Sequence, residues 1–438
     1  LDQLFYTPNR SSSSSNPIVV IFLPHGPVIW DVNEGDKIFK DQGCLVHNCR
    51  LTSRPADYFD AHAVLYRQFI ARLPPRPAGQ IWIMYSLESP HNTPSYNRPE
   101  YFNSINYTAT YRWDSDIVSP YGKYVTQATI RNYNNLKQFN KLTRKHMKNF
   151  KSTSDHHHHR YQLPHHSANN LFRHRRNITE HISANKSKMV AWFVSNCFTS
   201  NNRLHYANEL AKYIEIDMYG SCGTLICRRH NPECDRRLVH DYRFYLSFEN
   251  SNCIDYATEK FFDVALKHNV IPVVMGARKS DYSRIAPPHS FIHVDDFDSP
   301  ASLAKYLHYL AQNSTAYNEY FAWQLSGGRF IDTKFWCRLC AVLQAPIPKI
   351  YSSLETWWRP NGTCMSKKTA RWSDYPTALS YPNSDNMTSP PIESSNAASQ
   401  TSETKPKTST QNVFQKIKKH FYNVILKIKS SLGSGLYP

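Results

Sequence analysis

The sequence lacks any long hydrophobic run. No uninterrupted apolar stretch exceeds six residues, the length of Ile18 to Leu23, which is far shorter than the roughly 20 residues that a membrane-spanning helix requires. It also lacks an initiator methionine and a signal-like start. We therefore expect no membrane anchor within these 438 residues, which are enough for two domains of ordinary size with a large buried core.

Excess charge is absent from most of the chain. The formal net charge is +18, but it is concentrated in two segments. Segment 123–188 carries 14 Lys and Arg against two Asp and Glu, and segment 401–430 carries seven Lys against one Glu. These two segments account for the whole excess, so the remainder of the chain is neutral. Because the basic character belongs to appendages rather than to the folded body, we expect no nucleic-acid partner.

Cysteine is abundant. Ten cysteines are many for a cytosolic enzyme, but they suit an oxidising lumen in which disulfides persist. Seven Asn-x-Ser/Thr sequons favour the same compartment; they begin at Asn9, Asn106, Asn177, Asn185, Asn313, Asn361 and Asn386. Cys337 and Cys340 have a zinc-ligand spacing but lack a convincing second pair, so disulfides are favoured there. We expect a second disulfide set among Cys222, Cys227, Cys234 and Cys253.

Two blocks alternate strand-like and helical patterns, as paired βα domains do. The first block, 17–122, has strand-like runs at 18–23, 61–66 and 80–87. The second block, 189–330, has predicted strands at 190–195, 214–219, 244–248 and 291–294, and predicted helices at 204–213, 259–268 and 302–311. Residues 1–16, which contain a serine run, are predicted to be the remnant of a linker, or stem, that precedes the folded blocks.

Two further segments have the composition of appendages. Segment 123–188 is basic and His-rich, so we interpret it as a largely disordered insertion. Its histidine run, His156 to His159, leaves zinc or copper binding as an alternative. Segment 373–438 is predicted to be a flexible tail that ends in a basic amphipathic helix. That helix would bind a membrane interface or a partner, or dock on the body.

The stretch from Tyr242 to Gly276 is the most informative part of the chain. An alternating strand, Phe244 to Phe248, leads into a polar turn, and a helix is predicted to follow with Thr258 as its N-cap and Lys260 in its first turn. A helix N-terminus beyond the carboxyl end of a strand offers free N–H groups to a phosphate. The pattern alone also fits an ordinary βαβ unit with solvated charges.

The order of residues in this stretch resembles the signature of the α1,3-fucosyltransferases, inverting enzymes that move L-fucose from GDP-fucose to a sugar hydroxyl. The matching residues are Glu249, Asn250, Tyr256, Thr258, Glu259 and Lys260. The resemblance implies an α/β fold of the GT-B type, with two Rossmann-like domains facing a central cleft. Segment 17–122 would be the acceptor-side domain and segment 189–330 the GDP-fucose-binding domain. A Cys-containing segment, 331–372, would pack back on the first domain.

Glu88 is the candidate general base for the acceptor hydroxyl. It directly follows the apolar strand IWIMYSL, and the segment Glu88-Ser89-Pro90-His91 resembles the family segment that bears the catalytic base. Inverting transfer requires such a base, because the hydroxyl must lose its proton as it attacks the sugar. A strand-end carboxylate that merely caps the following turn is the alternative.

The other candidate site residues are expected to bind GDP-fucose, the donor of the fucose. Negative charge develops on the leaving diphosphate, so cations are expected there. The resemblance places Arg203 on the diphosphate with Lys260 as the second cation, Asn250 and Tyr256 on the nucleotide, and Glu259 on the fucose. Without the resemblance, Arg203 would be read as a solvated helix residue. A non-catalytic carbohydrate-binding relative is the remoter alternative for this chain, but loss of activity would more often have removed at least one of these groups.

The resemblance has further implications. It implies no required cofactor or metal, although a divalent metal can stimulate, and we interpret the pairs Asp114/Asp116 and Asp295/Asp296 as structural. It ties Cys337 and Cys340 to Cys44 and Cys49, although four cysteines allow three pairings. It implies a single-pass type II protein of the Golgi lumen whose anchor is missing from this chain.

The segments AWFVSNC, FENSNC and FWCRLCA are most similar to invertebrate and plant members that fucosylate the innermost GlcNAc of N-glycans. That acceptor is therefore our first expectation. Antennal LacNAc or LacdiNAc is the alternative, because acceptor choice depends on loops of the first domain, where the similarity is weakest.

Overall fold

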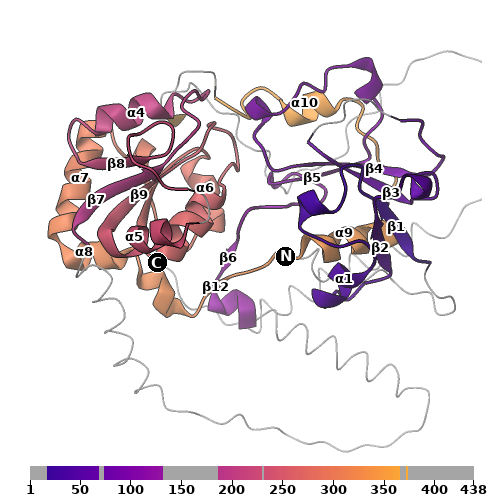
Figure 1. Ribbon diagram of the computed structural model, residues 1–438, viewed down its shortest axis with the longest axis horizontal. Helices are drawn as coiled ribbons and strands as arrows, with labels where there is room; N and C mark the ends of the chain where they lie inside the picture. The colour runs from indigo at the N-terminus through magenta and orange to yellow at the C-terminus, as the bar shows by residue number, and fades with distance from the viewer. Residues whose placement is uncertain (1–16, 69–73, 132–185, 229–230, 366–370, 373–438) are drawn as a thin grey trace, which may run out of the picture. The chain divides into compact units, whose positions relative to one another are not determined.

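Two five-stranded parallel sheets form the framework of the protein in this computed structural model, which describes residues 17–68, 74–131, 186–228, 231–365 and 371–372 (Figure 1). The first sheet has the order β2-β1-β3-β4-β5; its strands are β1 (Val19–Phe22), β2 (Cys49–Thr52), β3 (Ala63–Arg67), β4 (Ile81–Ser86) and β5 (Tyr107–Thr110). The second sheet has the order β11-β10-β9-β7-β8; its strands are β7 (Lys188–Phe193), β8 (Ile216–Tyr219), β9 (Tyr242–Phe248), β10 (Ile271–Met275) and β11 (Ile292–His293). All neighbouring strands in both sheets are parallel. This architecture confirms the expected α/β fold of the GT-B type.

Helices cover both faces of the second sheet. On one face, α4 (Arg203–Leu210), α7 (Pro300–Gln312) and α8 (Ser314–Glu319) share a core with the strands. On the other face, α5 (Pro232–Asp241) and the turn Lys260–Ala265 contribute to a second cluster. Helix α6 (Lys279–Ile285) packs against the same turn. Because both faces are covered, a central strand can be apolar throughout, as in β10, where every residue is buried.

The first sheet is completed by helices from the far end of the chain. Helix α1 (Lys37–Asp41) and helix α9 (Phe335–Gln344) pack on one face, and α10 (Leu354–Trp358) packs on the other. Figure 1 shows the orange α9 and α10 lying against the indigo first sheet. The chain therefore returns to its first domain after building the second.

Two disulfides hold the returning C-terminal segment against the first domain. Cys44 is bonded to Cys337 and Cys49 to Cys340, which confirms that the two cysteine pairs are linked to each other as the resemblance implied. The second set expected among Cys222, Cys227, Cys234 and Cys253 was wrong in part. Only Cys227–Cys234 lies within it; the other bonds are Cys197–Cys222 and Cys253–Cys364. Cys253 finds its partner outside the set because the returning C-terminal chain forms a β-bridge with it at Cys364.

The expected strands are present, and the expected helix after β9 differs in type. Residues Lys260–Ala265 form a π-helical turn, and Leu266–His268 form a 3₁₀ turn. The helix stops at Asn269, whose left-handed backbone (φ 53°) asparagine tolerates better than most residues. Thr258 does not cap this turn, because its hydroxyl is bonded to Glu249 instead.

Several expectations fall on residues outside the described ranges. These are the stem remnant 1–16, most of segment 123–188 with its histidine run, and the tail 373–438. The first residues of segment 123–188 do belong to the fold, because β6 (Tyr124–Val125) pairs with β12 (Arg329–Phe330). Among the described residues, no helix is both long enough and apolar enough to span a bilayer.

A buried lysine, Lys186, lies two residues before β7 of the second sheet. Lys186 donates to the carbonyls of Tyr242 and Asn269, both at 2.8 Å, and burial lowers the pKa of Lys186 from 10.5 to about 7. The unfolded chain therefore binds this proton up to higher pH than the folded chain, so the free energy of unfolding should rise between pH 7 and pH 10. Chemical denaturation of wild type and Lys186→Met at both pH values tests this. We expect a smaller rise in the variant; an equal rise would contradict the assignment.

Candidate active site

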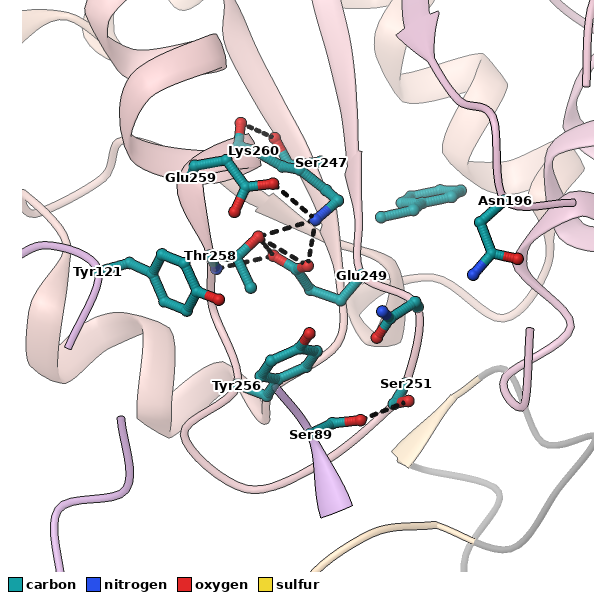
Figure 2. Close-up of polar contacts among 12 residues, drawn as sticks. Ser89, Tyr121, Asn196, Ser247, Glu249, Ser251, Tyr256, Thr258, Glu259 and Lys260 are labelled. Carbon is teal, nitrogen blue, oxygen red and sulfur yellow. Dashed lines mark hydrogen bonds and ion pairs between the residues drawn. The ribbon is translucent and has the colours of Figure 1, made fainter. Parts of the chain in front are cut away.

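A buried carboxylate organises the loop that follows β9. Glu249 comes directly after the strand and is 0% exposed. It accepts hydrogen bonds from the backbone N–H of Thr258 at 2.8 Å and from the Thr258 hydroxyl at 2.8 and 2.9 Å. The Lys260 ammonium donates to it at 3.0 Å (Figure 2). A carboxylate is tolerated in such a place only when it is paired and hydrogen-bonded, so the loop is folded around the Glu249–Lys260 ion pair.

Lys260, a member of this ion pair, also reaches the surface of the protein. Its ammonium also donates to Glu259 at 3.1 Å, and the side chains of Lys260 and Glu259 are 21% and 50% exposed. Burial acts to lower the pKa of Lys260, but the charges of Glu249 and Glu259 outweigh it and raise that pKa above its ordinary value. Lys260 is therefore a fixed cation whose outer side meets solvent.

A glycine at the end of β10 makes room for this carboxylate. Gly276 follows Met275 with a positive φ of 155°, and a Cβ atom at this position would lie 2.6 Å from Cγ of Glu249. The backbone N–H of Glu249 donates to the Met275 carbonyl at 2.8 Å. The ends of β9 and β10 thus approach each other closely enough that only glycine fits.

The candidate base comes from the first sheet and touches the same loop. Glu88 lies two residues beyond the end of β4 and is half-buried. Its Oε2 accepts from the Tyr256 hydroxyl at 3.1 Å and lies 3.5 Å from Nδ2 of Asn250. The structure therefore brings Glu88 together with two of the residues predicted to bind GDP-fucose. More than 160 positions separate Glu88 from either of them in the sequence.

A cluster of small polar side chains surrounds this contact. The Ser89 hydroxyl donates to the Ser251 hydroxyl at 2.9 Å, as Figure 2 shows. Nδ2 of Asn92 is 3.2 Å from both hydroxyl oxygens, and the Ser200 hydroxyl is also 3.2 Å from that of Ser251. Ser89 and Ser251 are fully buried. These bonds join the loop after β4 to the loops after β7 and β9.

Arg203 begins α4, as predicted, but it is not a solvated helix residue. It is buried, and its guanidinium donates to the carbonyls of Phe248 at 2.6 Å and Asn196 at 3.0 Å. The Nε atom is buried without a hydrogen-bond partner among the described residues. Burial lowers the pKa of Arg203, opposed by the charge of Glu249. Arg203 thus adds positive charge behind the loop.

The acidic pairs considered as metal ligands are bound within the protein. Asp114 pairs with Arg112, and Asp116 accepts from Lys349 and Tyr351. Asp295 accepts from the backbone of Trp372, and Asp296 pairs with Lys279. One further group of potential ligands, His91, Cys253 and Cys364, gathers in the described part of the chain, but its two sulfurs form a disulfide. These contacts fit a structural role for all four aspartates.

Sequence reasoning missed the central member of the site. Glu249 was matched as part of the motif but was not given a role, and neither Ser251 nor Asn201 was considered. Asn201 donates to the Glu249 carbonyl at 2.9 Å and to Asn252 at 2.8 Å. One signal was available: an acidic residue directly at the end of a largely apolar strand is favourable only if a cation meets it.

Two family models match successive parts of this chain. Residues 16–122 match the family model described as "Fucosyltransferase, N-terminal", and residues 183–357 match "Glycosyltransferase family 10 (fucosyltransferase) C-term". A solved α1,3-fucosyltransferase with GDP-fucose aligns with 78% of this chain and 95% of its own, at 16% identity and a TM-score of 0.46.

Curated relatives match over most of the chain. It is 39% identical to glycoprotein 3-alpha-L-fucosyltransferase A of Drosophila melanogaster, over 84% of this chain and 66% of that protein. It is 32% identical to alpha-(1,3)-fucosyltransferase C of the same organism, over 75% of this chain and 73% of that protein. For fut-1 of Caenorhabditis elegans the identity is 34%, over 58% of the relative. The chain thus spans about two thirds or less of the length of two of these three relatives. With both family models matched in order, the chain belongs to glycosyltransferase family 10, the fucosyltransferases.

Proposed function

We propose that this chain transfers L-fucose from GDP-fucose, with inversion, to the 3-hydroxyl of a GlcNAc residue. The observation that carries the proposal is the contact of Glu88 with Tyr256 and Asn250, in the same loop that holds the Lys260 cation. A base and a cation are the two groups that inverting transfer to a hydroxyl requires. Relatives named α1,3-fucosyltransferases support the choice of sugar and linkage.

In the proposed reaction, one residue accepts the proton that the acceptor loses, and two others stabilise the negative charge of the leaving group. Glu88 accepts the proton of the acceptor hydroxyl while that oxygen forms a bond to C1 of fucose. The bond from C1 to the diphosphate oxygen breaks on the opposite face, and its electron pair leaves with GDP. Lys260 and the guanidinium of Arg203 stabilise the charge that develops there. Asn250 contacts the nucleotide and Glu259 the fucose.

The acceptor we propose is the innermost GlcNAc of N-glycans. The name of one relative, a glycoprotein 3-alpha-L-fucosyltransferase, supports it. The test incubates the protein with GDP-fucose and a panel of N-glycans and LacNAc or LacdiNAc oligosaccharides, with and without EDTA. We expect transfer to the N-glycan core that EDTA does not abolish. Transfer to antennal sugars alone would replace the acceptor, and no transfer to any acceptor would overturn the activity.

The location we propose is the Golgi lumen, with the full-length protein held by an N-terminal anchor outside this chain. Five disulfides that use all ten cysteines support an oxidising compartment. Peptide N-glycosidase treatment of the protein from secretory cells should increase its electrophoretic mobility. Unchanged mobility would argue against passage through the secretory pathway.

A further inference from the structure

The hydroxyl of Tyr256 is directed at the candidate base rather than at open space. The side chain is 1% exposed, and its hydroxyl lies 3.1 Å from Oε2 of Glu88. The amide of Asn250 approaches the same oxygen atom at 3.5 Å. Within the described residues, Oε1 of Glu88 makes no hydrogen bond, so one carboxylate oxygen is held and the other is left for a substrate proton.

The direction of this hydrogen bond follows from electrostatics. Burial raises the pKa of Tyr256 well above its ordinary value, and the charges of Glu249 and Glu88 raise it further. The tyrosine therefore stays protonated in the neutral pH range. Its hydroxyl is the donor and Oε2 of Glu88 is the acceptor.

Packing holds the tyrosine ring in place. The rings of Tyr256 and Tyr111 lie 5.0 Å apart, and both belong to the core cluster of the first sheet that includes Trp358. Cys253, three residues earlier, is fixed by its disulfide to Cys364. Tyr256 therefore belongs to the second domain in sequence but is packed into the core of the first.

We propose that Tyr256 is a positioning residue for Glu88: its hydroxyl holds one carboxylate oxygen so that the other faces the acceptor. This rests on the proposed function, because it presumes that Glu88 is the base. It differs from the nucleotide contact that the family resemblance assigns to Tyr256. It also couples the two substrates, because the loop that carries the donor cation Lys260 also orients the group that activates the acceptor.

The test is Tyr256→Phe, which removes one oxygen atom and keeps the ring. We expect kcat to fall roughly 10- to 100-fold, the range that loss of a hydrogen bond to a charged group gives. The KM for GDP-fucose should not change.

Tyr111→Phe is the matched control. Its ring adjoins that of Tyr256, but its buried hydroxyl has no hydrogen-bond partner in the described part of the chain. The charge of Glu88 also acts on Tyr111 and Tyr121, and burial raises the pKa of both, so neither changes charge in the assay range. We expect the kcat of Tyr111→Phe and its KM for GDP-fucose to match those of wild type, and thermal unfolding should show that both variants are folded.

The possible outcomes separate the two proposals. An unchanged kcat in Tyr256→Phe overturns the positioning role. A higher KM for GDP-fucose with an unchanged kcat overturns it in favour of a nucleotide contact. By contrast, absence of transfer by wild type, or full activity in Glu88→Gln, would overturn the proposed function itself.

Discussion

Replacement of Glu88 by glutamine is expected to lower kcat for fucose transfer by about 10²- to 10⁴-fold, the range that general-base catalysis contributes. Glutamine has nearly the same shape, and its side-chain oxygen can still accept from Tyr256, so the loop should keep its structure. It cannot accept the acceptor proton. The KM for GDP-fucose should therefore change little, and steady-state kinetics with both substrates varied would show the separation.

Glu100→Gln is the control for loss of a carboxylate from the same domain. Glu100 is exposed and pairs only loosely with Arg98, at 3.9 Å, so its removal should leave kcat unchanged. If Glu88→Gln retained wild-type kcat, Glu88 would be only the strand-end carboxylate that its position after β4 also permits. A fall in kcat together with a lower unfolding temperature would show instead that the variant had damaged the fold.

The framework of the fold could be predicted because its strands are continuous apolar runs. β4 and β10 are buried almost throughout, and such runs bounded by polar turns are recognisable without any partner. The position of Glu88 just beyond β4 could be predicted for the same reason, since it stands at the end of such a run. β2 and β5 could not be predicted, because the four-residue segments CRLT and YTAT acquire strand structure only from their neighbours.

The contacts within the site could not be derived from the sequence. The burial of Glu249 depends on Lys260, eleven residues later in the chain, and on the absence of a side chain at Gly276. The inward orientation of Arg203 depends on two backbone carbonyls that become available only when β9 and the loop after β7 are in place. The sequence indicated which residues gather at the site, but not which atoms bond to one another.

Replacement of Lys260 by methionine should cost both stability and function. Without the ammonium, the fully buried Glu249 carboxylate keeps only its bonds from Thr258, and an uncompensated buried charge of this kind costs about 3–5 kcal/mol of unfolding free energy. Burial already raises the pKa of Glu249, and Lys260 is the main opposing influence. Transfer should also fall, because the cation expected at the diphosphate is gone. Urea denaturation and kcat/KM for GDP-fucose measure the two effects separately.

A second substitution should separate stability from function. In Glu249→Gln/Lys260→Met the neutral amide can still accept from Thr258, and no buried charge is left unpaired, so most of the lost unfolding free energy should return. Activity should not return, because the double variant still lacks the cation.

Lys279→Met is the matched control: Lys279 pairs with Asp296 but is 57% exposed, and exposed pairs are worth about 0–1 kcal/mol. If Lys260→Met were as stable as this control, Lys260 would not be the group that neutralises Glu249. If the double variant regained transfer as well as stability, the cation would serve only the fold, and stabilisation of the leaving diphosphate would have to come from Arg203.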